Sequence, residues 1–344
     1  MAIGPKAPAL IAISMGDPAG IGAEIILKSA AVLARRRRAP VLVVIGDLNV
    51  MRETARRLKR VPTPRPWTPE APPVGLESGL SVLAASELPQ RARRPGHSTV
   101  AGGEASFQYV TRGARMAMSG EVDALVTAPI SKRGWHRAGH EYPGHSELVA
   151  ELGRARTWRM MFAGAQLKLV LVTVHIGLRE VSSKLTRGTV LETIRLLHQH
   201  LREGGSRLQP RIAVLGFNPH AGEQGLFGDE EIRAINPAIK AARHSGIDAF
   251  GPLAPDTAFV RTNGRFNFDA VVAMYHDQGL IPLKTLEFDR AVNVTLGLPF
   301  IRTCPDHGTA FDIAGHGRAN PASMIAAIEY ASRAVDSRAA QRAA

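Results

Sequence analysis

The stretch at residues 9–24, ALIAISMGDPAGIGAE, joins a short apolar run to a turn that contains three glycines. The run ALIAIS has the composition of a buried strand, and the glycines and proline after it indicate a turn into a helix. The spacing of Gly16, Gly20 and Gly22 does not match the G-x-G-x-x-G fingerprint of dinucleotide-binding folds, and no Gly-Lys-Ser/Thr follows, as a P-loop requires. The stretch therefore predicts the start of a β-α-β unit but no nucleotide pocket at this turn.

Apolar, β-branched runs alternate with amphipathic stretches over the rest of the chain. Further strands are predicted at 41–46, 122–129, 167–175, 211–220 and 268–276. Helices are predicted at about 21–36 and 102–119 and, most clearly, at 189–202. A segment with six prolines, 61–73, is predicted to be a surface loop. This alternation predicts an α/β fold with a mostly parallel sheet covered by helices on both faces, and 344 residues favour two domains.

The net charge of +13 raises the question of a nucleic-acid partner. The arginines are concentrated locally, for example at 35–38, and the few aromatic residues (5%) are not interleaved with them. A base-stacking surface is therefore not expected, and a positive field suits small anionic substrates equally well.

The remaining composition indicates a folded cytoplasmic protein. The single cysteine, Cys304, excludes an internal disulfide and fits a reducing compartment. No apolar run approaches the roughly 18 residues of a membrane span, and the N-terminal 18 residues are predicted to contain the first strand rather than a signal peptide.

Three histidines occupy equivalent places in the predicted fold. His175, His220 and His276 each lie at the carboxyl end of a predicted strand, where ligands gather in α/β sheets. Each could be an ordinary strand-end histidine, but three neutral imidazoles with an open position also suit a catalytic divalent cation. Asp277 would then orient the neighbouring ring, or it could simply be solvated.

Two other groups of polar residues have the chemistry of an anion site. Lys284, Asn293 and Arg302 recur every nine residues, as substrate contacts or as surface residues that flank the buried strand VNVTL. Upstream, His145 and Ser146 open a predicted helix after Lys132. Ser146 could cap that helix, or these side chains and the exposed amides could form an anion-binding corner.

A glycine-containing segment, CPDHGTAFDIAGHGRAN (304–320), follows shortly after Arg302. Its glycines allow close approach of the backbone to a ligand, and its polar side chains offer hydrogen bonds. The alternative interpretation is a loop that leads into a final helix near Pro321.

These motifs occur together, and in the same order, in a known family. MGDPAGIG, TAPISK, GHSE, FNPHAGE, YHDQG and VNVTLGLPFIRT followed by DHGTAFDIAG resemble the 4-hydroxythreonine-4-phosphate dehydrogenases of pyridoxal phosphate biosynthesis, over about residues 9–335. The resemblance implies a two-domain α/β fold like that of the isocitrate and isopropylmalate dehydrogenases, with an interdomain cleft. We expect 1–130 with 278–344 to form the domain that carries the cofactor loop. We expect 131–277 to form the second domain, with the metal ligands and the dimer contacts.

The resemblance also assigns roles to residues of this sequence. The implied ligands of a divalent cation (zinc, magnesium or cobalt) are His175, His220 and His276. The implied substrate-binding residues are His145, Ser146, Lys284, Asn293 and Arg302. The implied contacts of NAD, or of NADP, are His307, Gly308, Ala310 and Asp312. Lys284, as a proton acceptor, and Asp277 are the candidate catalytic residues.

The activity implied is NAD-dependent oxidation of 4-phosphohydroxy-L-threonine at C3 and decarboxylation to 3-amino-2-oxopropyl phosphate, for pyridoxine 5′-phosphate biosynthesis. The implied assembly is a homodimer whose subunits share each active site.

Ser146 stands where the family usually has threonine, and Ala23 where it has proline. Ser146 leaves open a paralogue that oxidises D-threonate or D-erythronate 4-phosphate, or a cis-dihydrodiol. More remote alternatives are a phosphate acyltransferase and a basic nucleic-acid-binding module.

Overall fold

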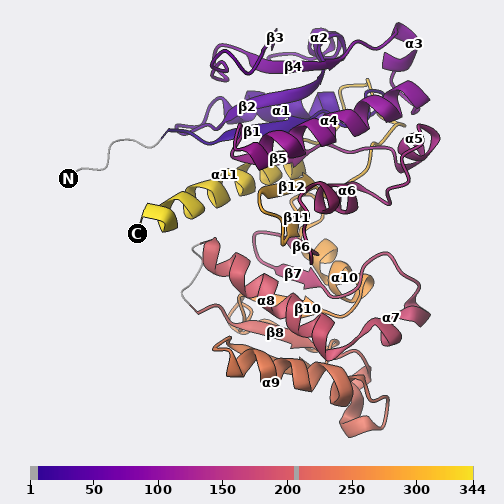
Figure 1. Ribbon diagram of the computed structural model, residues 1–344, viewed down its shortest axis with the longest axis vertical. Helices are drawn as coiled ribbons and strands as arrows, with labels where there is room; N and C mark the ends of the chain where they lie inside the picture. The colour runs from indigo at the N-terminus through magenta and orange to yellow at the C-terminus, as the bar shows by residue number, and fades with distance from the viewer. Residues whose placement is uncertain (1–6, 205–208, 344) are drawn as a thin grey trace. The chain divides into compact units, whose positions relative to one another are not determined.

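The computed structural model describes residues 7–204 and 209–343 (Figure 1). Residues 1–6 and 344 of the first expected domain, and 205–208 of the second, lie outside the described residues. The chain forms two compact units: unit 1 comprises Met1–Ala155 and Leu298–Ala339, and unit 2 comprises Arg156–Gly297 and Ala340–Ala344. Among the described residues, no helix combines the length and apolarity needed to cross a membrane.

The unit boundaries differ from the expected domain boundaries at two places. Residues 131–155 belong to unit 1, because the helices they form pack against the long helix α4 (Val100–Ser119). Residues 278–297 belong to unit 2, because α10 (His276–Glu287) and β11 (Val292–Leu296) pack against strands of that unit. The first unit is discontinuous in sequence, as is the first expected domain.

The strands of unit 1 are all parallel and follow the order β3-β4-β2-β1-β5-β12. They are β1 (Leu10–Ser14), β2 (Val41–Asp47), β3 (Pro64–Pro66), β4 (Leu80–Ser86), β5 (Ala124–Thr127) and β12 (Ile301–Pro305). The helices, besides α4, are α1 (Gly22–Leu33), α2 (Leu48–Arg57), α3 (Gln90–Arg93), α5 (Lys132–Arg137), α6 (His145–Leu152) and α11 (Ala322–Ala343). The central strands β1, β2 and β5 are almost wholly buried, as expected of parallel strands inside a helix-covered sheet.

The proline-rich segment predicted to be a loop contains the short strand β3. This strand pairs with β4 at the end of the strand order. Proline lacks an N–H group and is therefore confined to sheet edges, which explains both the position and the three-residue length of β3.

The MGDPAGIG turn joins β1 to α1, as predicted. A Cβ atom on Gly22 would lie 2.1 Å from the Met15 carbonyl oxygen, so glycine is required where the helix begins. The buried Asp17 carboxylate accepts hydrogen bonds from Ala19 N (2.9 Å) and Ser98 Oγ (2.5 Å). Burial raises the pKa of Asp17, against the lowering effect of these two hydrogen bonds.

The strands of unit 2 follow the order β11-β6-β7-β10-β8-β9. Besides β11, they are β6 (Arg159–Ala163), β7 (Lys168–Leu171), β8 (Ile212–Leu215), β9 (Ala249–Leu253) and β10 (Ala270–Ala273). β6 is antiparallel to both of its neighbours, and the pairs of β10 with β7 and β8 are parallel. The sheets of the two units are therefore mostly parallel, as predicted, although no strand was predicted at the positions of β4, β6, β9 or β12.

The helical segments of unit 2 pack on this sheet and on one another. Besides α10, they are α7 (Leu178–Lys184), α8 (Arg187–Glu203), the 3₁₀ segment η1 (Pro219–Gly225), the π-helical segment η2 (Glu231–Ile235) and α9 (Asn236–His244). The core joins side chains of β6, β7, β8, β10 and α10, including Phe162, Leu169 and Leu283. This packing holds the strand ends described next.

Candidate active site

The three histidines follow three neighbouring parallel strands of unit 2. β7 ends at Leu171, β10 at Ala273 and β8 at Leu215, and β10 pairs with both of the others. The carboxyl ends of parallel neighbours lie at the same sheet edge. The segments that lead to His175, His276 and His220 therefore leave the sheet at one edge.

His175 and His276 are the pair for which the structure records a ring contact. Their ring centroids are 5.9 Å apart, close to the separation of about 5 Å that two imidazoles have when they bind one ion tetrahedrally. His276 Nδ1 lies 2.7 Å from Asp277 Oδ1, an arrangement that orients a ring and leaves its Nε2 for a ligand.

The donor types fit a divalent cation, but the described residues of one chain do not complete a site. They contain no group of three or more His, Cys, Asp or Glu side chains placed to hold a metal ion. The metal site formed by His175, His220 and His276 therefore stays a prediction.

A buried cation lies at the centre of the candidate anion site in unit 1. Arg302, on β12, is only 1% exposed. Its Nη2 donates to Thr127 Oγ1 at the end of β5 (2.6 Å), and its Nη1 donates to Ser146 Oγ (3.4 Å). A guanidinium with neighbouring hydroxyl groups is suited to bind phosphate or carboxylate.

The structure decides between the two interpretations of Ser146. The N-cap position of α6 is Gly144, with no side-chain capping bond, and Ser146 is the second residue of the helix. Its hydroxyl accepts from Arg302 instead, so Ser146 belongs to the polar cluster. Lys132 is the first residue of α5. Its side chain lies beside the start of α6, because its Cε would be 3.6 Å from a Cβ atom on Gly144.

The surroundings of His145 favour the neutral form of its ring. Desolvation lowers the pKa of its ring well below 6.5, and the charges of Arg302 and Lys132 lower it further, against the raising effect of a hydrogen bond with the Ala128 backbone. The ring packs edge-on against Trp135, with 5.6 Å between centroids. Within the described structure its Nε2 is buried and has no hydrogen-bond partner, so this atom is available to a substrate.

Lys284 and Asn293 lie in unit 2, whereas Arg302 lies in unit 1. Lys284, on α10, has its Nζ 5.6 Å from the Phe288 ring centroid. Asn293 lies on β11, and its buried Oδ1 has no hydrogen-bond partner among the described residues. The nine-residue recurrence therefore does not place the three side chains on one element.

The predicted cofactor loop is attached to α1. Thr309 O accepts from Ile21 N (3.1 Å), and Ala319 N donates to Glu24 Oε1 (2.7 Å). Lys28 Nζ donates to the carbonyl oxygens of Gly317 and Ala319, both at 2.8 Å. The helix that follows the first motif thus contacts this loop. The i, i+4 spacing of Glu24 and Lys28 predicts only their ion pair on one helix, so no local signal indicated the contact.

The predicted cofactor contacts lie between β12 and the residues of the loop that contact Lys28. His307 Nδ1 is 3.1 Å from the Gly308 carbonyl oxygen, and Ala310 has a φ of +41°. A Cβ atom on Gly308 would meet nothing within 4 Å, so this glycine borders open space. Asp312 is exposed. These positions leave the backbone accessible to a ligand.

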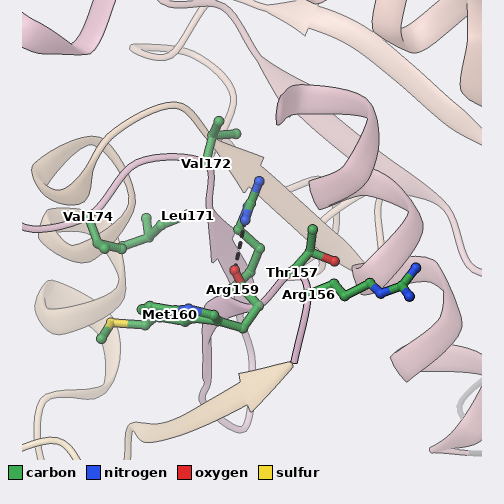
Figure 2. Close-up of a pocket in the computed structure, with 8 residues that line it drawn as sticks. Arg156, Thr157, Arg159, Met160, Leu171, Val172 and Val174 are labelled. Carbon is green, nitrogen blue, oxygen red and sulfur yellow. Dashed lines mark hydrogen bonds between the residues drawn. The ribbon is translucent and has the colours of Figure 1, made fainter. Parts of the chain in front are cut away.

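A pocket of about 280 Å³ lies in unit 2, between the start of β6 and the end of β7 (Figure 2). Val172 and Val174, on the segment that leads to His175, form part of its wall. Arg159 also lines it, but its guanidinium donates hydrogen bonds to Trp158 O and Thr193 Oγ1, both at 2.8 Å. The pocket contains none of the predicted site residues.

Comparisons with known proteins agree with these motifs. The family model of the pyridoxal phosphate biosynthetic protein PdxA matches residues 38–331. A 4-hydroxythreonine-4-phosphate dehydrogenase of Geobacter metallireducens is 49% identical over 333 residues, which cover 94% of this chain and 95% of the relative. The chain belongs to the PdxA family.

Other PdxA-like proteins match over a similar length. A D-threonate 4-phosphate dehydrogenase of Pectobacterium atrosepticum is 43% identical over 324 residues, which cover 94% of this chain and 98% of the relative. The crystal structure of a 4-hydroxythreonine-4-phosphate dehydrogenase from Klebsiella pneumoniae has a TM-score of 0.83 and 42% identity, covering 95% of this chain and 98% of that one. The PdxA family thus includes relatives named for two substrates.

Proposed function

We propose that this chain is a dehydrogenase that oxidises 4-phosphohydroxy-L-threonine at C3 with NAD⁺ and releases 3-amino-2-oxopropyl phosphate after decarboxylation. The structural observation that carries the proposal is the buried Arg302 with the Thr127 and Ser146 hydroxyls, next to a neutral His145, in a chain of the PdxA family. This cluster can bind the anionic groups of such a substrate without help from the exposed arginines.

The oxidation transfers the C3 hydride to NAD⁺ and the hydroxyl proton to a base. Lys284 is the proposed proton acceptor, and the loop that contains His307, Gly308, Ala310 and Asp312 is the proposed cofactor site. The β-keto acid formed then loses CO₂, and a proton returns to the carbon that carried the carboxylate. His145, Ser146, Lys132 and Arg302 orient the substrate throughout by holding its phosphate and carboxylate groups.

A divalent cation bound by His175, His220 and His276 would lower the pKa of a coordinated alcohol. Because the described residues of one chain do not gather three metal donors, we further propose a homodimer in which the subunits share each site. The reducing compartment indicated by the single cysteine supports a cytoplasmic location.

A second candidate is oxidation of D-threonate 4-phosphate. It is favoured by the serine at position 146, whose hydroxyl contacts Arg302 but which lacks the methyl group of threonine. This smaller side chain leaves space beside the guanidinium for a substrate of different shape.

A comparison of substrates tests both candidates. NADH formation is measured with 4-phosphohydroxythreonine, D-threonate 4-phosphate and D-erythronate 4-phosphate, at saturating Zn²⁺, Mg²⁺ or Co²⁺. We expect the highest kcat/KM with 4-phosphohydroxythreonine. A higher value with either sugar-acid phosphate overturns the first assignment, and no NADH with any of them overturns the dehydrogenase assignment.

A further inference from the structure

The segment between β8 and η2 carries His220 in an unusual backbone conformation. Six successive residues have positive φ: His220 (52°), Ala221 (53°), Gly222 (82°), Glu223 (40°), Gln224 (57°) and Gly225 (104°). Four of the six are not glycine, and for such L-residues this region is sterically unfavourable. A left-handed turn of this length persists only when its surroundings hold it in place.

Glu231, the first residue of η2, makes hydrogen bonds with the residues just before the turn. Its Oε1 accepts from Phe217 N (2.6 Å) and Asn218 N (2.8 Å), and its Oε2 accepts from Asn218 Nδ2 (2.9 Å). The side chain is 2% exposed. A buried carboxylate that accepts from three N–H groups makes strong, geometrically specific contacts.

The left-handed turn lies directly on this carboxylate. A Cβ atom on Gly222 would be 2.7 Å from Glu231 Oε2, and one on Gly216 would be 3.1 Å from Glu231 Oε1. The glycines before and within the turn therefore allow the backbone to approach the carboxylate closely. Glu231 thus contacts both the entry to the turn and its middle.

Two further side chains, Glu230 and Gln278, make hydrogen bonds around the turn. Glu230 Oε2 also accepts from Asn218 Nδ2 (2.7 Å), and Glu230 accepts from Ser182 Oγ on α7. On the other side, Gln278 Nε2 donates to Gly216 O (2.7 Å), and Gln278 Oε1 accepts from Met274 N (2.7 Å).

The third strand end joins the same network. Thr173, two residues before His175, donates from its Oγ1 to Met274 O (2.8 Å). Met274 lies two residues before His276, and its backbone N–H donates to the Gln278 side chain. The Gln278 amide in turn donates to the Gly216 carbonyl oxygen. The segments that carry the three histidines are therefore connected by side-chain hydrogen bonds.

We propose that Glu231 is a positioning residue for the reaction: it holds the left-handed turn and thereby fixes the orientation of His220. The inference rests on the proposed function, because it assigns His220 to the site. It goes beyond that function by giving a role to Glu231, whose buried carboxylate contacts the turn that contains His220. Replacing that carboxylate disturbs the orientation of His220 and leaves the Arg302 cluster of unit 1 unchanged.

The test compares Glu231→Gln with wild type and with Glu223→Gln, which removes the same charge from an exposed position of the turn. Hydrogen exchange of residues 216–228 is expected to accelerate in Glu231→Gln only. Co²⁺ affinity, followed through the d–d absorption of the bound ion, is expected to fall about tenfold or more. The kcat is expected to fall with little change in the KM of the phosphorylated substrate.

Other variants make each outcome decisive. If Glu231→Gln does not fold, Asn218→Ala removes the side-chain bonds to both carboxylates and is expected to cause a smaller change in the same direction. A lower unfolding temperature with unchanged Co²⁺ affinity, Co²⁺ spectrum and kcat would give Glu231 a purely structural role and overturn the inference. So would an equal effect of Glu223→Gln.

His220→Ala separates this inference from the proposed function. If His220→Ala keeps its Co²⁺ affinity and activity, the proposed role of His220 fails, and with it the inference. If His220→Ala loses both while Glu231→Gln retains both, only the positioning role is wrong.

Discussion

At the residue scale, the environment of His145 has a direct consequence for pH dependence. Its ring is desolvated and lies near the charges of Arg302 and Lys132, so its pKa in the folded protein is well below 6.5. Below pH 6.5 the unfolded chain binds a proton at this residue that the folded chain does not bind. The free energy of unfolding therefore falls as the pH drops below 6.5, because the unfolded state gains a bound proton. Above pH 6.5 this loss of stability does not occur.

We expect the His145 ring to stay neutral at pH 6 in the folded protein. His145→Gln should show a smaller loss of unfolding free energy than wild type between pH 6.5 and pH 5. Nitrogen-15 NMR of the ring and denaturant unfolding measure the two effects. In Arg302→Met the ring pKa should rise toward 6.5, and an unchanged pKa would contradict the assigned role of that charge.

Arg302 itself should dominate the binding of anionic substrate. Because the guanidinium makes two directed contacts in a buried site, a lysine cannot reproduce its geometry. We expect Arg302→Lys to raise the KM of the phosphorylated substrate by about 10- to 100-fold, the loss of one or two charge-assisted hydrogen bonds. Steady-state kinetics measure this, and Arg154→Lys, at an exposed position of unit 1, is the matched control.

At the scale of elements, helix α1 and the loop after β12 form one structural assembly within unit 1. The Glu24–Lys28 ion pair (2.7 Å) on α1 binds backbone groups of Gly317 and Ala319. These contacts join segments nearly three hundred residues apart in the chain, which explains how a motif with no nucleotide fingerprint can still affect the proposed cofactor site.

We expect Lys28→Met to loosen this loop. The KM for NAD⁺ should rise severalfold with little change in kcat. The unfolding free energy should fall by about 2–4 kcal/mol, because two charge-assisted hydrogen bonds to the loop backbone and the ion pair with the buried Glu24 are lost. Lys240→Met, at an exposed position of α9, should change neither quantity. An unchanged KM for NAD⁺ in Lys28→Met would contradict the placement of the cofactor on this loop.

At the scale of the whole molecule, the proposed shared site predicts complementation between inactive subunits. His175 and His276 are close within one chain, and none of the three histidines belongs to a three-donor group among the described residues. If His220 acts on the partner's site, a mixed dimer of His220→Ala and His276→Ala has one intact site.

We expect co-expression of these two variants, with different affinity tags, to restore up to about a quarter of wild-type activity in a two-fold symmetric dimer. Each variant alone should be inactive. Sedimentation velocity checks that the mixed species is a dimer. Activity no greater than the sum of the two variants would mean that all three histidines act within one chain.

Much of the architecture could be predicted from sequence because its signals are local. Buried runs such as ALIAIS and FDAVVAM mark parallel strands, and an amphipathic stretch such as 102–119 marks a helix, since each depends only on the period of nearby apolar residues. The antiparallel strand β6 and the proline strand β3 depend instead on their partners, and their short sequences contain no such period.

The site shows the same division. Sequence determined the residue types, their order and their positions after strands, and it was sufficient to indicate the PdxA family. Tertiary structure alone decided that Ser146 binds Arg302 rather than capping α6, that α1 holds the loop after β12, and that Glu231 supports the turn of His220. These contacts join residues distant in the chain, and their strength comes from desolvation and hydrogen-bond geometry, which the order of residues does not specify.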